Sequence, residues 1–212
     1  ETPISISSPV KGDNWLFINQ STLAYHFYTL FFVNGRIGTG ERYAFDNIQI
    51  DEQGEYFNGD PTVNESYYNY KDTLFAVANG TVISIKDGRP ENAGNSKNIT
   101  FSDVDELGGN YLILDIGNSH YAFYAHCVPG SFMVKPGDVI TEGTPIALLG
   151  NSGNSDCPHL HFQICDSPHF FETNGLPFVL KKYTKVGDYP NFNSLPTEIF
   201  NSMMEEYTII SF

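Results

Sequence analysis

Two histidines stand one residue apart in the stretch "GNSGNSDCPHLHF", residues 150–162, directly after a run of turn-forming residues. In an extended strand, side chains at positions i and i+2 lie on the same face, about 6.6 Å apart along the chain. His159 and His161 would then project into one space, while Leu160 and Phe162 would face a hydrophobic core. This arrangement suits a metal or catalytic site, although the polar face of a half-buried strand explains an isolated pair more simply.

Two further residues have the chemistry that would complete a hydrolytic site. Zinc hydrolases commonly use three protein ligands, with histidine and carboxylate as suitable types, and leave one position open for water. The segment "HYAFYAHC" contains His126, which strand alternation places on one face with His120, Ala122 and Tyr124. Asp46 ends the short apolar segment "ERYAFD". Each signal alone is weak, because an aspartate at a strand end is usually a solvated turn residue.

These residues stand among short segments with strand propensity, separated by turns. The 19 glycines, 12 prolines and 15% aromatic residues favour short strands and many turns over long helices. The segments "YLILDI" and "HYAFYAH", joined by "GNS", predict a β-hairpin, and "NITFSDV" and "HLHFQIC" predict further strands. The segment "PTEIFNSMMEEY" predicts a short helix that opens at Pro196. We therefore expect a mostly β fold, an antiparallel β-sheet core with long loops and a short C-terminal helix.

The overall composition excludes some classes of function. The formal net charge of −14, from 25 acidic and 11 basic residues, repels phosphate backbones, so we expect no nucleic-acid partner. No apolar run approaches the length of a transmembrane segment. The chain starts at Glu1 rather than Met, which fits removal of an export signal or simply a trimmed chain. With three cysteines, the chain does not have the composition of a disulfide scaffold.

The order of the motifs resembles that of the lysostaphin-type zinc endopeptidases, the LytM family, which cut peptidoglycan cross-bridges. The resemblance is carried by "FYAHC" at 123–127, "VKPGDVITEGTPIALLGNSGNS" at 134–155 and "PHLHF" at 158–162. It extends back through "DTLFAVANGTVISIKDG" and "RYAFD", and so covers roughly residues 20–166. Chance is a poor explanation, because the glycine turns, the proline and H-x-H occur together in this order.

The resemblance implies a domain organisation and an activity. The fold would be of the lysostaphin and LytM type, built on a duplicated hybrid motif. Residues 1–212 would form a single domain, with a metallopeptidase-like core at 20–166 and a C-terminal extension at 167–212 that packs on the core. The activity would be zinc-dependent hydrolysis of peptide cross-bridges or stem peptides in bacterial peptidoglycan. Such a protein would be secreted, extracellular or associated with the bacterial cell envelope.

The resemblance also assigns roles to individual residues. His161 matches a zinc ligand, and Asp46 matches the carboxylate ligand. His159 and His126 match a catalytic pair that would activate the attacking water and stabilise the oxyanion of the tetrahedral intermediate. Under this assignment, one histidine of H-x-H holds Zn²⁺ and the other takes part in the reaction.

The chain departs from the family at the first zinc ligand. The usual motif is His-x-x-x-Asp, but the residue four positions before Asp46 is Arg42, which cannot act as a ligand. The sequence is similar to a subgroup with the motif Arg-aromatic-Ala-x-Asp and a histidine twenty positions upstream. That histidine is His26 here, in "LAYHFY". It would replace the missing ligand if residues 22–33 and 41–50 lie side by side in one sheet; otherwise it is a structural histidine among aromatic residues.

Three residues are candidates for substrate binding. Arg42 has the guanidinium needed to pair with an acidic group or to bind a substrate carboxylate. Tyr67 and Tyr68, in a loop rich in Asn, Asp and Tyr, would wall a peptide groove, although aromatic packing explains them equally well. Cys127 should point away from His126, whereas Cys157, in the loop before His159, can approach the metal.

Three classes of function fit these observations to different degrees. The first is the zinc endopeptidase, acting on Gly- or D-amino-acid-containing peptides of the cell wall. The second is a family member that has lost zinc and serves as a cell-wall-binding or hydrolase-activating module. The third is a carbohydrate-binding β-sandwich that uses its aromatic residues to stack on sugars. This third class gives no reason for "YAH" and H-x-H to occur in this order. The zinc endopeptidase and the zinc-free module differ in whether His26 supplies the missing first zinc ligand.

Overall fold

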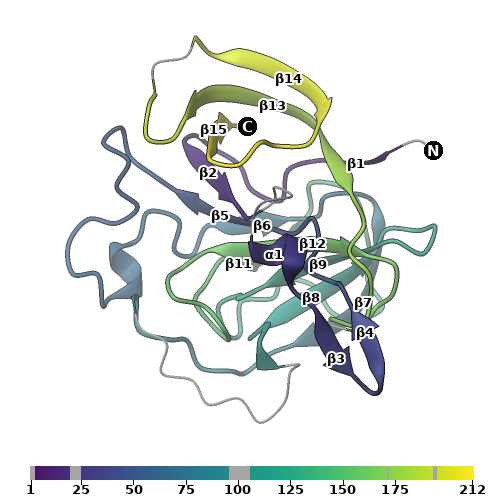
Figure 1. Cartoon of the computed structure of the whole chain (residues 1–212). Helices are drawn as coiled ribbons and strands as arrows, with labels where there is room; N and C mark the ends of the chain where they lie inside the picture. Colours follow the sequence, from purple (N-terminus) through teal and green to yellow (C-terminus); the bar gives the residue numbers. More distant parts are fainter. Residues whose placement is uncertain (1–2, 20–24, 96–105, 171, 193–194) are drawn as a thin grey trace.

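A computed structural model describes residues 3–19, 25–95, 106–170, 172–192 and 195–212 (Figure 1). The predicted strand "NITFSDV" lies outside these ranges. In the described residues no helix is long and apolar enough to cross a membrane.

The helices of the described residues are α1 (Tyr25–Tyr28) and a 3₁₀ turn (Asn64–Ser66). The strands are β1 (Ile4–Ile6), β2 (Trp15–Ile18), β3 (Phe31–Val33), β4 (Arg36–Gly38), β5 (Phe45–Gln49), β6 (Thr73–Phe75), β7 (Gly80–Lys86), β8 (Tyr111–Asp115), β9 (Tyr121–Ala125), β10 (Val139–Ile140), β11 (Pro145–Leu148), β12 (Leu160–Cys165), β13 (Phe178–Asp188), β14 (Thr197–Ser202) and β15 (Thr208–Ser211).

One large sheet organises the described residues. Its strand order is β1-β13-β15-β2-β5-β12-β9-β8-β7-β10, with β14 paired to β13 off this path. Strands β1 and β13 run parallel, and the other neighbours in this sheet are antiparallel. Two small sheets, β6–β11 and β3–β4, complete the set. The expectations of a mostly β fold with an antiparallel core, and of the β8–β9 hairpin, are confirmed.

The central strands present different side chains on their two faces. Phe17, Phe45 and Phe162, on β2, β5 and β12, are buried in the main hydrophobic core together with Tyr124 of β9. The ring centroids of Phe45 and Phe162 lie 5.2 Å apart, and those of Tyr124 and Phe162 lie 5.1 Å apart. Because successive side chains of a strand point to opposite faces, the residues between these aromatic anchors face the other side of the sheet.

The predicted C-terminal helix is wrong. Residues 197–202 form β14 instead, at the end of the molecule where β13 and β15 also lie (Figure 1). Strand β14 pairs with β13, with Ile199 opposite Tyr183 and Phe200 opposite Lys182. The β-branched and aromatic residues of this segment favour a strand, and the exposed edge of β13 supplies the hydrogen-bonding partner that a sequence window does not reveal.

The aromatic packing under β12 generates a stability prediction. We expect Phe162→Ala to lower the free energy of unfolding by about 3–5 kcal/mol, because the substitution leaves a cavity beneath the strand that carries the H-x-H histidines. The matched control is Phe32→Ala, since Phe32 is 77% exposed, and it should change stability by less than about 0.5 kcal/mol. Urea unfolding followed by circular dichroism measures both; equal losses for the two variants would contradict this packing.

Candidate metal centre and catalytic pocket

A cavity of 530 Å³ opens on the face of the sheet opposite the main core. Four of the six histidines of the chain line it, namely His26, His126, His159 and His161, together with Asp46. His26, His126 and His161 are buried, and His159 is partly exposed. The sequence predicted each of these five residues as a ligand or a catalytic group, and the structure brings all five into one pocket.

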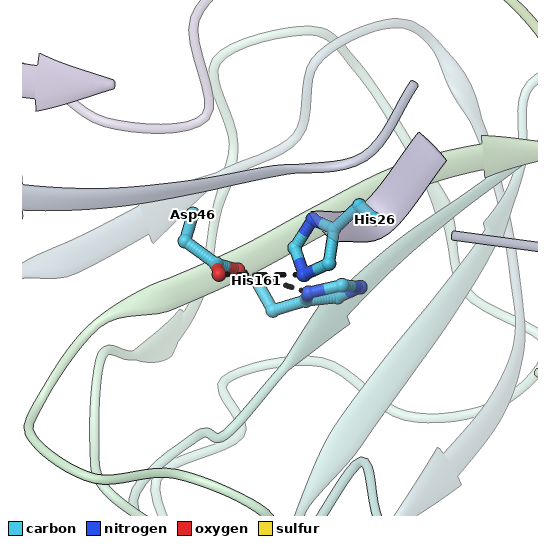
Figure 2. A group of neighbouring side chains, drawn as sticks. All are labelled: His26, Asp46 and His161. Atoms are coloured by element: carbon cyan, nitrogen blue, oxygen red, sulfur yellow. Dashed lines mark hydrogen bonds and ion pairs between the residues drawn. The ribbon is translucent and has the colours of Figure 1, made fainter. Parts of the chain in front are cut away.

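The Asp46 carboxylate is the centre of this cluster. Its Oδ1 lies 3.0 Å from Nδ1 of His161 and 3.6 Å from Nε2 of His159. Its Oδ2 lies 3.4 Å from Nε2 of His26 and accepts a hydrogen bond of 2.8 Å from Nδ2 of Asn19. Figure 2 shows the side chains of Asp46, His26 and His161 converging from β5, α1 and β12.

Register and a short helix bring the three side chains of Figure 2 together. Asp46 on β5 and His161 on β12 are directly paired across the antiparallel ladder, so their side chains share a face. His26 reaches them from helix α1, with 4.9 Å between its ring centroid and that of His161. The condition set for His26, that 22–33 and 41–50 lie side by side in one sheet, is not the way it reaches the site, because β3 pairs with β4 in a separate sheet. A helix places His26 where a strand was expected to place it.

These three residues have the donor set of a metal site. Two imidazole nitrogens and one carboxylate oxygen, from His26, His161 and Asp46, all lie within 4.8 Å of one another. Histidine and carboxylate are ligand types that suit zinc, and three protein ligands leave a position open in a tetrahedral site. The residues present therefore fit a Zn²⁺ ion with room for a substrate or water.

A left-handed backbone conformation carries His126 into the pocket. Its φ is +65°, which an L-residue with a side chain rarely adopts, and it stands just after the end of β9. Plain strand alternation had placed His126 on the face of Tyr124, but Tyr124 and Cys127 both lie in the main core. The prediction of a shared face is therefore wrong, because the irregular residue reverses the direction of the side chain.

The hydrogen bonds of His126 and His159 define their tautomers. Nδ1 of His126 lies 2.7 Å from the carbonyl oxygen of Ser152, and Nδ1 of His159 lies 2.8 Å from that of Cys157. A carbonyl oxygen only accepts, so Nδ1 donates its hydrogen in both rings. Each neutral ring therefore keeps an unprotonated Nε2 that can accept a proton, and the ring centroids lie 4.6 Å apart.

Burial and charge give the histidines different protonation states. Burial, reinforced by the nearby His159 and His161, holds the pKa of His126 well below its usual range. Burial also lowers the pKa of His159, although the Asp46 charge opposes this effect. For His161 the hydrogen bond and charge of Asp46 outweigh burial and raise its pKa to about 9. Two neutral imidazoles and one imidazolium thus lie side by side in the metal-free pocket.

Asp46 is ionised in this surrounding. Burial by itself raises the pKa of its carboxyl group, but the charge of His26 and the hydrogen bond from His161 have the larger combined effect. The pKa of Asp46 therefore lies well below its usual range. An ionised carboxylate is the form that binds a metal cation.

The structure does not bring the three predicted substrate-binding residues to the cavity lining. The guanidinium carbon of Arg42 lies 5.0 Å from the ring centroid of Phe27, where the cation packs over the aromatic face. Tyr67 is 3% exposed and its hydroxyl donates to the carbonyl oxygen of Pro61. Tyr68 is 37% exposed, and its hydroxyl donates to Oδ2 of Asp51. Aromatic packing, the alternative explanation, accounts for Tyr67, which contacts the rings of Tyr56 and Phe57, whereas Tyr68 lies at the surface.

Other residues line the cavity that the sequence did not single out. Ile18, Ile48 and Tyr56 form an apolar wall, and Asn19 holds the Asp46 carboxylate. Ile18 is opposite Asp46 in the β2–β5 ladder, so its side chain had to share the face of the histidines. Cys157, in the loop before His159, also lines the cavity. The sequence pattern does not predict that β2 pairs with β5, so the apolar wall could not be predicted from the sequence.

Comparison with known proteins identifies relatives of part of the chain. Residues 69–172 match the family described as Peptidase family M23. This segment contains His126, His159 and His161 but begins after His26 and Asp46. The peptidoglycan DD-endopeptidase ShyA of Vibrio cholerae is 29% identical over 89 residues, which cover 42% of this chain and 20% of ShyA. An uncharacterized metalloprotease of Haemophilus influenzae is 33% identical over 95 residues, which cover 44% of this chain and 18% of that protein.

One solved structure that matches part of the chain is the catalytic domain of lysostaphin from Staphylococcus simulans. The match has 24% identity and a TM-score of 0.36, and it covers 57% of this chain and 86% of that domain. Against the curated relatives the chain spans much less, about a fifth of the length of those two proteins.

The raised pKa of His161 generates a prediction about metal binding. At pH 7.5 the metal-free His161 ring is protonated, since its pKa is about 9, and a metal that takes Nδ1 must displace that proton. We expect Zn²⁺ binding at pH 7.5 to release about one proton and the affinity to rise as the pH approaches 9. Calorimetry in two buffers of different ionisation enthalpy counts the released protons.

The control variant is His120→Ala, which removes a histidine that does not line the cavity and should leave the proton count unchanged. Binding that releases no proton at pH 7.5 would show that the metal does not take the His161 nitrogen beside Asp46.

Proposed function

Because the chain belongs to the LytM-like peptidases of family M23, we propose that it is a zinc-dependent endopeptidase that hydrolyses peptides of bacterial peptidoglycan. The observation that carries the proposal is the convergence of His26, Asp46 and His161 beside the neutral pair His126 and His159 in one cavity. The first three residues have the donor set that suits zinc, and the other two stand within reach of a group bound there.

The proposed chemistry is hydrolysis of an amide bond. Zinc, when bound, supplies a Lewis acid that lowers the pKa of a water molecule and polarises the substrate carbonyl. His126 and His159 each offer an unprotonated Nε2, since their Nδ1 hydrogens are donated to the Ser152 and Cys157 carbonyls. We assign to this pair the removal of a proton from the attacking water, because burial keeps both rings neutral and able to accept it.

The proton returns to the substrate in the second half of the reaction. Once Nε2 of His126 or His159 has taken up the proton, it is a hydrogen-bond donor and stabilises the oxyanion of the tetrahedral intermediate. As the C–N bond breaks, the same proton passes to the leaving amine, and the carbonyl carbon retains the oxygen of water. The histidine pair returns to its neutral state, so one water molecule is consumed for each bond cut.

The cavity walls and the substrate bear on where the protein acts. Ile18, Ile48 and Tyr56 belong to one small apolar cluster beside the histidines, and we assign to them the exclusion of water around the bound peptide. Bacterial peptidoglycan lies in the cell envelope, so we propose that the protein acts there or is secreted. The peptidoglycan endopeptidase ShyA is the relative that supports this choice of substrate.

The ligand assignment generates a prediction for zinc binding. We expect His26→Ala and His161→Ala each to weaken zinc binding by more than about 100-fold, since each removes one of three protein ligands. Removing a residue that merely hydrogen-bonds to a ligand already lowers metal affinity by about 10–100-fold. Arg42→Ala should retain zinc, because Arg42 packs on Phe27 rather than in the cavity. Metal content after dialysis and chelator competition give the values.

The outcome also decides between the two family functions. Full zinc binding by His26→Ala would remove His26 from the ligand set. If the unaltered protein binds no zinc when zinc is abundant, the proposal of a peptidase gives way to that of a non-catalytic cell-wall-binding or hydrolase-activating module. Arg42, which stands where the family usually has a zinc-binding histidine, would favour this non-catalytic function.

The catalytic assignment generates a separate prediction for turnover. We expect His126→Ala and His159→Ala each to lower kcat by about 10²-fold or more, the usual cost of losing general-base or oxyanion assistance. Zinc content should stay near that of the unaltered protein, because neither residue is a proposed ligand. Release of new amino groups from purified bacterial cell walls measures the rate, with His120→Ala as the control. Near-normal turnover in both variants would show that these roles are misassigned.

A further inference from the structure

Strand β12 carries a second polar side chain on the same face as His161. His161, Gln163 and Cys165 are at positions i, i+2 and i+4, and all three are buried on the cavity side of the sheet. Nε2 of His161 lies 2.9 Å from Oε1 of Gln163. The Gln163 side chain is 0% exposed, so no bulk water competes for this contact.

The orientation of the Gln163 amide is fixed by its other partners. Its NH₂ group donates to the carbonyl oxygen of Phe170 at 3.3 Å and to Sγ of Cys165 at 3.1 Å. A flipped amide would place its oxygen against the Phe170 carbonyl, which cannot donate. The Cys165 thiol in turn donates to the carbonyl oxygen of Gly40 at 3.5 Å, so the sulfur accepts from Gln163. Oε1 therefore has to face His161.

The backbone leaves room for this amide. A Cβ atom on Gly40 would lie 2.8 Å from the Phe170 carbonyl oxygen and 3.3 Å from Nε2 of Gln163. The absence of a side chain at Gly40 thus allows the carbonyl and the amide to approach each other. Gln163 thus bonds to two side chains of its own strand and to the Phe170 carbonyl, and these contacts hold the amide in a single orientation.

An amide oxygen accepts but never donates, so Nε2 of His161 must carry a hydrogen. We propose that Gln163 is a positioning residue that holds His161 in the tautomer with hydrogen on Nε2 and thereby leaves Nδ1, beside Asp46, as the nitrogen that binds the metal. The inference rests on the proposed zinc site and adds to it the group that orients one ligand. Hydrogen bonds of this kind fix the ring orientation and the tautomer of ligating histidines.

Two substitutions at Gln163 separate positioning from simple packing. Gln163→Met keeps the length of the side chain and removes the acceptor, so we expect zinc binding to weaken by about 10–100-fold. Gln163→Glu keeps an acceptor for His161 but buries a charge facing the Phe170 carbonyl, which lowers the stability of the metal-free protein. We therefore expect the Gln163→Glu variant to be less stable than the Gln163→Met variant. We also expect the Glu variant to bind zinc more tightly than the Met variant.

The measurements are chelator competition for zinc and urea unfolding of the metal-free protein. The matched control is Gln49→Met, the same chemical change at a residue outside the cavity, and it should leave zinc affinity unchanged. Zinc affinity that simply follows stability across the variants, or a Met variant that binds as tightly as the unaltered protein, would overturn the inference while leaving the zinc site in place. Absence of zinc from the unaltered protein would overturn both proposals.

Nuclear magnetic resonance on the unaltered protein gives a test that depends on no variant folding. In ¹⁵N-labelled protein loaded with zinc, the His161 ring should show a hydrogen on Nε2 and none on Nδ1. A hydrogen on Nδ1 in the zinc-loaded protein would mean that the metal takes the other nitrogen, and the inference would be wrong.

Discussion

The ionised carboxylate of Asp46, buried in the lining of the cavity, is the constraint on which the rest of the site depends. A buried charge without partners is strongly destabilising, so the surrounding groups have to compensate it. The chain supplies Asn19 from the end of β2, His26 from α1 and His161 from β12. Side chains from three elements thus converge on two oxygen atoms, and the same convergence creates a place for a cation. Stability and the proposed metal binding draw on one set of contacts.

The environment also divides similar side chains into different roles. His126, His159 and His161 are neighbouring imidazoles, yet only His161 makes a close hydrogen bond to the carboxylate. Burial favours the neutral form of the other two rings, and backbone carbonyls take up their Nδ1 hydrogens. In the proposed assignment, the difference between a ligand and a base therefore lies in which partner each ring meets. Residue type alone contains no information on that partner.

The alternation of H-x-H was enough to predict from the sequence that Leu160 and Phe162 pack in the core while the histidines face a site. The same rule failed at His126, because a single residue with positive φ breaks the period of two. It also failed for the C-terminal segment, where pairing with β13 decides the conformation. Asn19 went unnoticed because a lone amide has no sequence signature. For Gln163 a signal existed, since it stands two residues after His161 on the same strand.

The position of β15 in the sheet has a consequence for how the protein is made. Strand β15, residues 208–211, pairs with β2, and β2 pairs with the β5 strand that carries Asp46. Strand β2 therefore has a free edge until residues 208–211 are available to pair with it. Such pairing of residues far apart in sequence is slow, and unpaired strand edges invite aggregation. The half of the sheet beside the cavity can reach its final pairing only once residues 208–211 fold onto β2, so the open edge of β2 is exposed to aggregation in every intermediate that lacks β15.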